Sequence, residues 1–375
     1  MDRLQEKTTA PYPPVGADGG QSLSQKPNQS IAEGVTEHKP PERDLEEILR
    51  QISRVNDPAY LPTVSMNDLY EQVYPGRPPV VDGLLYAGTY LFVGAPKVGK
   101  SFLMAQLAYH VSTGLPLWGH AVQQGTVLYL ALEDDHRRLQ ERLYRMFGTE
   151  GTGNLHFAIY AKQLGGGLEE QLKKFVQEHP DTRLIIIDTL QKIREAGAEK
   201  YSYANDYEVI TKLKRFADIS GVCLLVVHHT RKQQADDKFD MISGTNGLLG
   251  AADGAFLLQK ERRTDSAATL DISGRDQQDQ RLYLTRNSER LIWELQRAET
   301  EFHHEAPDPV LEAVAAFITS ERPVWCGTAT ELAAALEINM KPNALAMRLN
   351  VRAWQLNCKY HICYESARTH AGRSI

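Results

Sequence analysis

Cysteine is scarce in this sequence, and long apolar runs are missing. The four cysteines among 375 residues include no C-x-x-C pair, so their spacing predicts neither a zinc site nor a disulfide framework. No apolar run approaches the roughly 20 residues that span a bilayer, and the polar N-terminus is unlike a signal peptide. We therefore expect a cytoplasmic protein without a membrane partner. The cysteines are Cys223, Cys326, Cys358 and Cys363.

Large apolar side chains are rare in residues 1–45, where six prolines fall by position 41 and Tyr12 is the only aromatic residue. Such a segment buries too little surface to offset the entropy that is lost on ordering. We expect residues 1–57 to form a disordered N-terminal segment and linker. Apolar residues at helical spacing predict a short amphipathic helix at 44–55, either stable or transient.

An excess of positive charge is also missing from the chain as a whole. Its 48 acidic and 42 basic residues give a net charge of −6, which gives no general sign of nucleic-acid binding. The distribution is uneven, because residues 341–375 carry six Lys or Arg against one Glu. Hydrophobic content of 42% and charged content of 24% are typical of a soluble globular protein, and the length allows two or three domains.

A phosphate loop is the most specific feature of the sequence. The apolar run 90–93 predicts a strand, residues 94–101 match G-x-x-x-x-G-K-[ST], and apolar residues at helical spacing follow. Backbone N–H groups and the helix N-terminus would hold phosphate oxygens. Lys100 would reach the β- and γ-phosphates, and Ser101 would bind Mg²⁺. We expect ATP to bind at Gly94, Ala95, Pro96, Lys97, Val98, Gly99, Lys100, Ser101 and Phe102.

Apolar strands alternate with amphipathic helices after this loop. The alternation predicts an α/β fold with a mostly parallel central sheet, which a run of late strands extends. The expected strands after the first are residues 126–132, 155–161, 184–187, 222–227, 255–259, 268–273, 281–286 and 290–295.

Carboxylates end two strands of the predicted sheet. Asp188 follows four hydrophobic residues, which is the Walker B pattern of a Mg²⁺ ligand. Glu133 closes the strand after the phosphate-loop helix, where its carboxylate would orient and deprotonate the attacking water. Asp134 and Asp135 compete for this catalytic role, although helix capping explains an acidic residue at the start of a helix.

A histidine pair ends the strand after the Walker B strand. We expect His228 to sense the γ-phosphate and relay its loss to the following loop; the alternative is a structural histidine at a strand end. His229 is expected to point to the opposite face. The loops 191–205 and 230–250 contain basic residues such as Arg194 that suit a phosphate backbone, although scattered surface charges would look the same.

The basic C-terminal stretch, residues 305–375, predicts three helices and a hairpin, the pattern of a winged helix-turn-helix. In the third helix Arg348, Arg352 and Gln355 recur at i, i+4 and i+7 and share one face. Two arginines and an amide suit base edges in a major groove. An ordinary solvated face or a protein-docking surface are the alternatives. The hairpin residues placed to hold phosphates are Arg368 and Arg373.

The phosphate loop, Glu133, Asp188 and His228 together resemble the RecA/DnaB-like ATPases. Within that group residues 66–297, with the phrase APKVGKS and the later ALEDD, are similar to the RepA-type AAA ATPases of plasmids, phages and integrated mobile elements. The resemblance implies that Lys100 and Ser101 belong to the phosphate loop and that Glu133 is the catalytic base. It also implies that Asp188 is the Mg²⁺ ligand and His228 the sensor, in agreement with the local sequence patterns.

The resemblance also implies an assembly. In such proteins six subunits form a ring, ATP lies between neighbours, and single-stranded DNA passes through the centre. A neighbouring subunit supplies a basic residue to each site, and Arg275, in a turn between two late strands, best matches the position that DnaB-like proteins use. The plasmid helicases draw an arginine from the segment corresponding to 243–256, which has none here. The smallest plasmid helicases lack a C-terminal winged helix.

We therefore predict an ATPase, with an ATPase domain at 58–298 and a DNA-binding domain at 305–375. The most specific prediction is a homohexameric helicase that acts in the replication of a plasmid, phage or integrated element. Single-stranded DNA would pass through the ring and double-stranded DNA would bind the C-terminal domain. Two alternatives remain: an ATP-dependent DNA-binding or loading switch that does not unwind, and a clock-type signalling ATPase without nucleic acid, against which the basic C-terminus argues.

Overall fold

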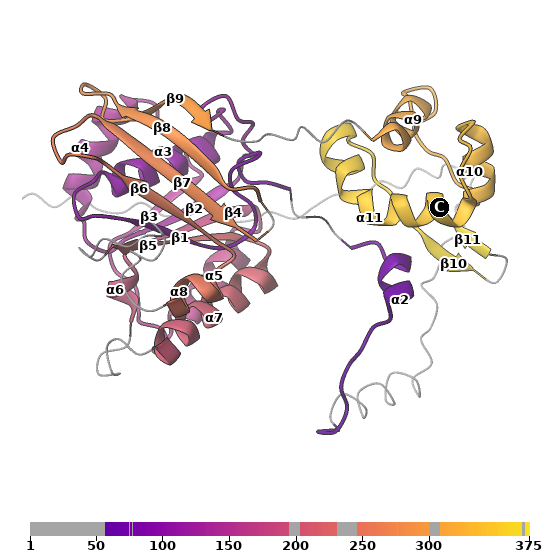
Figure 1. The fold of residues 1–375 in the computed structure, drawn as a ribbon, viewed down its shortest axis with the longest axis horizontal. Helices are drawn as coiled ribbons and strands as arrows, with labels where there is room; N and C mark the ends of the chain where they lie inside the picture. Colours follow the sequence, from indigo (N-terminus) through magenta and orange to yellow (C-terminus); the bar gives the residue numbers. More distant parts are fainter. Residues whose placement is uncertain are drawn as a thin grey trace, which may run out of the picture. The chain divides into compact units, whose positions relative to one another are not determined.

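The computed structural model describes residues 57–74, 76, 78–194, 203–230, 246–275, 277–299, 308–369 and 372–375 (Figure 1). The chain divides into two compact units, Met1–Val64 and Ser65–Ile375. In the first unit only residues 57–64 are described, and they are exposed. The helix predicted at 44–55 lies outside the described residues. None of the described helices has the length and apolar character needed to cross a membrane.

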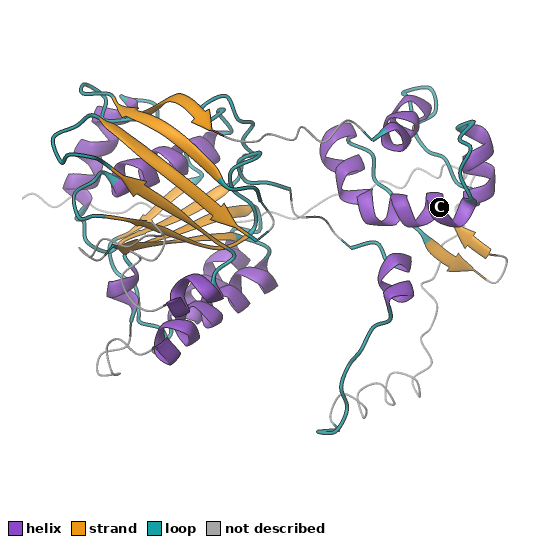
Figure 2. Ribbon diagram, in the orientation of Figure 1, coloured by secondary structure: helices purple, strands orange, loops and turns teal. Residues whose placement is uncertain are grey.

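A single sheet of nine strands, in the order β3-β2-β4-β5-β1-β6-β7-β8-β9, is the centre of the second unit (Figure 2). All pairings from β3 to β6 are parallel, whereas β6 to β9 pair antiparallel. The predicted α/β fold with a mostly parallel sheet is therefore confirmed. The strands are β1 (Gly88–Gly94), β2 (Thr126–Ala131), β3 (Leu155–Ala158), β4 (Thr182–Asp188), β5 (Cys223–His229), β6 (Gly254–Gln259), β7 (Ala267–Gly274), β8 (Gln280–Arg286) and β9 (Trp293–Glu299).

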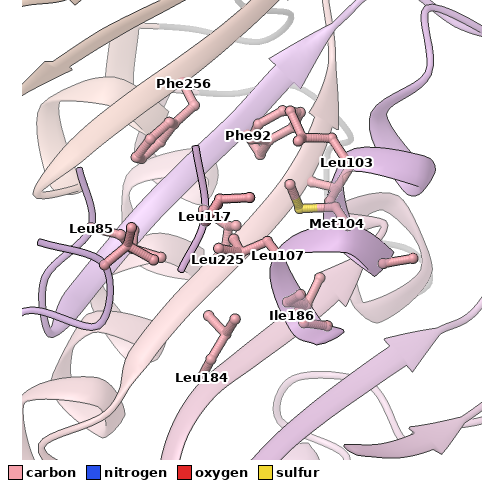
Figure 3. Close-up of a cluster of buried hydrophobic side chains, with 14 of the residues drawn as sticks. Leu85, Phe92, Leu103, Met104, Leu107, Leu117, Leu184, Ile186, Leu225 and Phe256 are labelled. Carbon is pink, nitrogen blue, oxygen red and sulfur yellow. The ribbon is translucent and has the colours of Figure 1, made fainter. Parts of the chain in front are cut away.

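Both faces of the parallel strands are covered by helices, so β1 and β2 are buried along their whole length. Alternate side chains enter different cores: Phe92 joins the core under α3 (Figure 3), and Leu91 joins the core on the opposite face, to which α5, α7 and α8 contribute. The helices of this part are α3 (Lys100–Thr113), α4 (His136–Phe147), α5 (Leu168–Glu178), α6 (Leu190–Ile193), α7 (Tyr203–Ser220) and α8 (Asn246–Ala251).

Local signals set the ends of the two helices nearest the phosphate loop. Gly114 ends α3 in the left-handed conformation, with φ of 74°, where a glycine carries no steric penalty. The Asp135 side chain accepts a hydrogen bond from the Arg138 N–H and so caps α4. Gly148 ends α4.

The C-terminal residues form three helices and a hairpin around a separate apolar core that includes Val314, Leu345 and Leu349. A capping box of Thr328 and Glu331 opens the second helix. Thr328 also forms an antiparallel bridge with Ser374 of the hairpin. The elements are α9 (Pro309–Phe317), α10 (Ala329–Ala335), α11 (Pro342–Tyr360), β10 (Ala367–Thr369) and β11 (Gly372–Ser374).

A short helix that precedes the sheet, α2 (Met66–Glu71), is bonded to α11. The buried Asn350 side chain donates from Nδ2 to the carbonyl oxygens of Tyr70 (3.0 Å) and Glu71 (3.2 Å). Its Oδ1 accepts from the Tyr364 hydroxyl at 3.0 Å. Asn350 therefore supplies hydrogen-bond partners to carbonyls at the C-terminal end of α2, which a helix leaves unsatisfied.

Candidate functional site

The phosphate loop connects the end of β1 to the start of α3, as the sequence predicts. Gly99, the residue before α3, has φ of 112°. As a glycine it has no side chain that could cap the first turn of the helix. The first N–H groups of a helix have no partner within the helix, and together with the helix dipole they form an anion site. The loop is therefore suited to phosphate oxygens.

The Lys100 side chain lies folded against this loop. Its ammonium donates to the carbonyl oxygens of Gly94 (2.8 Å) and Ala95 (3.0 Å), and only 6% of the residue is exposed. Burial lowers the pKa of Lys100 to about 8, while the negative charges of Asp188 and Glu133 act in the opposite direction. A phosphate group would compensate this buried positive charge.

Ser101 and Asp188, the two predicted Mg²⁺ ligands, contact each other. Asp188 is the last residue of β4, and its Oδ2 accepts from the Ser101 hydroxyl at 2.7 Å and from the Tyr129 hydroxyl at 2.9 Å. Burial raises the pKa of Asp188, although both hydrogen bonds lower it. Mg²⁺ is commonly held by one or two carboxylates together with nucleotide phosphates. This hydroxyl and carboxylate fit that coordination.

Tyr129 is a residue of the site that the sequence reasoning missed. It lies on β2, beside β4, and its ring is fully buried within the apolar core. Burial raises the pKa of Tyr129 well above its usual value, so the hydroxyl is protonated at neutral pH and donates to Asp188. The signal in the sequence was a phenol in an otherwise aliphatic buried strand, where a hydroxyl needs a partner.

Glu133 follows β2 and is exposed at the edge of the sheet where the phosphate loop lies. Its Oε1 accepts a hydrogen bond from the Thr189 hydroxyl at 3.2 Å. Thr189 follows Asp188 in the chain, and the peptide bond between these two residues is cis. The competing acids are engaged elsewhere: Asp134 forms a bidentate pair with Arg142, and Asp135 caps α4. Of the three acids, Glu133 is placed best to act as a base.

The histidine pair is oriented in the opposite sense to the prediction. His229 Nδ1 lies 3.0 Å from the Lys100 ammonium, whereas His228 is buried with 6% exposure. The two histidines do point to opposite faces, but it is His229, opposite Gly94 in the register, that shares the face of Val227 and of the core under α3. Burial, and then the charge of Lys100, lower the pKa of His229. Its neutral ring accepts the hydrogen bond from Lys100.

Arginines surround Phe102 on the first turn of α3. The guanidinium carbons of Arg286 and Arg142 lie 4.0 Å and 5.0 Å from the centre of the ring. Burial, and then the charges of Arg145 and Arg142, lower the pKa of Arg286. Arg142 is paired with Asp134, whereas Arg286 and Arg145 donate to backbone carbonyls, so the charges of these two favour a negatively charged ligand beside the loop.

Arg275 lies at the sheet edge away from the phosphate loop of its own chain. It follows β7, whose last residue Gly274 pairs with Gly254, which pairs with Tyr90 near the start of β1. The exposed Arg275 side chain donates to the Gly250 carbonyl at 2.9 Å. Arg275 therefore cannot complete the site of its own chain, and its action on a neighbour stays a prediction.

Two groups of predicted DNA contacts are not arranged as expected. Arg194 forms a buried ion pair with Asp206 at 2.7 Å, because a helix follows the loop and supplies the carboxylate. In the C-terminal domain Gln355 is only 7% exposed, and Arg348 pairs with Asp308 at 2.9 Å. The helical face was wrongly assigned because α11 packs on more than one side. The predicted basic residues outside the described residues are Lys200, Arg231, Lys232 and Lys238.

Fold and site together define a P-loop ATPase domain with a RecA-like sheet: a phosphate loop after β1, an acid after β2 and a Walker B carboxylate at the end of β4. Residues 56–235 match a protein family described as an AAA domain. No curated protein matches the chain.

The solved structures that are similar to the chain include the following three. The ATPase domain of G40P has a TM-score of 0.47 and 16% identity, over 68% of this chain and 99% of that one. A KaiC-like protein of the archaeon Pyrococcus horikoshii has a TM-score of 0.43 and 14% sequence identity. This match covers 60% of this chain and 99% of that one. A DnaB-like replicative helicase, described with its interactions with primase, has a TM-score of 0.48 and 16% sequence identity. This match covers 67% of this chain and 71% of that one. The ATPase assignment rests on the site and the family match.

Proposed function

We propose that the protein is an ATP-driven motor acting on DNA, and most specifically a RepA-type hexameric helicase that replicates a plasmid, phage or integrated element. The observation that carries the proposal is the division of catalytic groups between two sheet edges. Lys100, Glu133 and Asp188 lie around one phosphate loop, and Arg275 lies at the other edge. A ring of subunits would bring Arg275 of one chain to the loop of the next.

The residues of one chain have distinct roles in this proposal. Bound ATP with Mg²⁺ supplies the phosphoryl group whose transfer to water drives the motor. Glu133 orients the water and accepts its proton. Lys100 and the N-terminus of α3 would hold the phosphates, and Ser101 with Asp188 would hold the metal. Because it contacts Lys100, His229 replaces His228 as the residue that senses the γ-phosphate.

Strand displacement on a forked DNA duplex tests the motor. We expect unwinding that requires ATP hydrolysis, and an ATPase rate that single-stranded DNA increases. ATP-dependent DNA binding without strand displacement would favour the loading switch. ATP hydrolysis that neither single- nor double-stranded DNA changes, by a chain that binds neither, would favour the signalling ATPase.

For the C-terminal domain we propose a winged helix that binds double-stranded DNA. Its support is the order of elements: α9, a bridging residue, α10, α11 and the β10–β11 hairpin. Thr328 forms an isolated bridge with Ser374, and Gly327 exchanges backbone hydrogen bonds with Ile375, so the residues before α10 lie alongside the hairpin. This is the order and pairing in which a wing follows a recognition helix.

The hairpin, rather than α11, is the better candidate for the DNA contact. The residues of α11 that are exposed before Lys359, such as Ala344 and Val351, carry no charge, and Gln355 is buried. In the full chain, replacing both Arg368 and Arg373 with Ala should weaken duplex binding and reduce its salt dependence, because fewer counterions are released. Unchanged binding would point to a protein partner for this domain. The matched control is Arg322→Ala, whose guanidinium stacks on Phe317.

A further inference from the structure

Trp293, at the start of β9, reaches the phosphate loop from the antiparallel end of the sheet. It is fully buried, with an exposed fraction of 0%. Its indole Nε1 donates to the Gly99 carbonyl at 3.3 Å. The same carbonyl accepts the first hydrogen bond of α3, from the Leu103 N–H at 3.2 Å. A residue 194 positions away in the chain is thus bonded to the turn that opens the phosphate site.

The indole ring also fills the space beside Gly99. A Cβ atom on Gly99 would lie 2.8 Å from Cζ2 of Trp293, closer than real Cβ contacts allow. The glycine is therefore required for two reasons: its φ of 112° disfavours a side chain, and the ring occupies the position where that side chain would lie. In return, the ring limits movement of the loop toward the sheet.

Trp293 itself is held from both sides. On α3, the Gln106 side chain accepts from the Trp293 N–H at 2.7 Å and donates to the Trp293 carbonyl at 2.9 Å. The Trp118 indole donates to that carbonyl at 2.8 Å. Four hydrogen bonds, those of Gln106 and Trp118 and the one to Gly99, therefore fix the backbone and the ring of a single residue.

We propose that Trp293 is a positioning residue for nucleotide binding, which sets the orientation of the phosphate loop; the inference rests on the proposed ATPase function. The Gly99 carbonyl belongs to the same planar peptide group as the Lys100 N–H. Fixing the carbonyl therefore fixes the direction in which this N–H faces a phosphate. Without the indole bond the peptide plane can tilt, and the loop must be ordered at the moment of binding, which weakens affinity.

Replacing Trp293 with Phe in the full chain removes the N–H donor and keeps an aromatic ring. We expect the Kd for a non-hydrolysable ATP analogue with Mg²⁺ to rise about fivefold, as the loss of one neutral hydrogen bond implies. In ATPase assays KM should rise with kcat nearly unchanged, because ground state and transition state lose the same contact.

Trp118→Phe is the matched control, because it removes an indole bond to the Trp293 carbonyl without touching the loop. Both variants should lose thermal stability, and only Trp293→Phe should lose affinity. An unchanged Kd in Trp293→Phe, or equal losses in both variants, would overturn the proposal. No binding by the unmodified chain would instead overturn the proposed function itself.

Tryptophan fluorescence keeps the proposal testable if Trp293→Phe does not fold. In a chain whose other three tryptophans are replaced by Phe, the emission reports on Trp293 alone. Binding of the analogue should shift this emission, because the bonded carbonyl lies next to the phosphate site. An emission that the analogue leaves unchanged, in a chain shown to bind it, would contradict the role. The replaced residues are Trp118, Trp325 and Trp354.

Discussion

The parallel and antiparallel halves of the sheet contribute to the site in different ways. Parallel strands all end at one edge, so β1, β2, β4 and β5 bring the phosphate loop, Glu133, Asp188 and His229 together. Antiparallel strands alternate in direction, so β8 ends and β9 begins at this edge, whereas β7 ends at the opposite one. The parallel half therefore assembles the chemistry, and the antiparallel half supports it and carries Arg275 away from it.

The largest expected effect is in the parallel half. Replacing Glu133 with Gln should lower ATP turnover by about 10²–10⁴-fold, the usual contribution of a general base. ATP binding should be nearly unchanged, because the carboxylate acts on the water and does not hold the nucleotide. Single-turnover hydrolysis and equilibrium binding, measured side by side, check both parts.

Asp134→Asn is the control for this variant, because Asp134 pairs with Arg142. It should affect stability more than turnover. If Glu133→Gln kept half of the original rate while Asp134→Asn did not, the catalytic base would have to be reassigned to Asp134, which follows the same strand.

Arg275→Ala tests whether the antiparallel half completes a neighbour's site. Turnover should fall by about 10²–10³-fold, the typical cost of losing one transition-state charge contact. Mixing this variant with Glu133→Gln should restore part of the activity, because some interfaces then contain both intact residues. Co-assembled mixtures without any recovery would count against a shared site. Arg281→Ala is the control, since Arg281 pairs with Asp271 within its own chain.

Sequence reasoning served the parallel half better because its signals are local. Strand, loop and helix follow one another at the phosphate loop, and an apolar strand that ends in Asp188 is a short pattern. The Tyr129 hydroxyl and the Trp293 indole act across 59 and 194 positions of the chain, so a local pattern can show that a buried polar group needs a partner but not which residue supplies it. The histidines were exchanged because neighbouring residues of a strand point to opposite faces of the sheet, and the sequence pattern of the strand does not show which face carries α3.

A third prediction uses the lowered pKa of Lys100. Burial lowers it to about 8 in the free protein, and bound phosphates would raise it again, so binding above pH 8 takes up a proton. By linkage, affinity then falls as the pH rises between the two pKa values. We expect the Kd for ATP to be about tenfold higher at pH 9 than at pH 7. A Kd that stays constant to pH 9 would show that Lys100 is charged throughout and contradict the effect of burial.

The smallest expected effect concerns Tyr129, which supports Asp188 from within the parallel half. Tyr129→Phe removes only the hydroxyl that donates to Asp188 at 2.9 Å. Asp188 keeps its bond from Ser101, so the carboxylate is retained but is less firmly oriented. Outer partners of this kind usually tune metal affinity. We expect the Mg²⁺ concentration for half-maximal nucleotide binding to rise about threefold to tenfold, the equivalent of one hydrogen bond.

Tyr109→Phe is the control, because Tyr109 stacks on Phe147 and does not contact Asp188. An equal Mg²⁺ requirement in Tyr129→Phe and Tyr109→Phe would show that the hydroxyl contributes to stability alone.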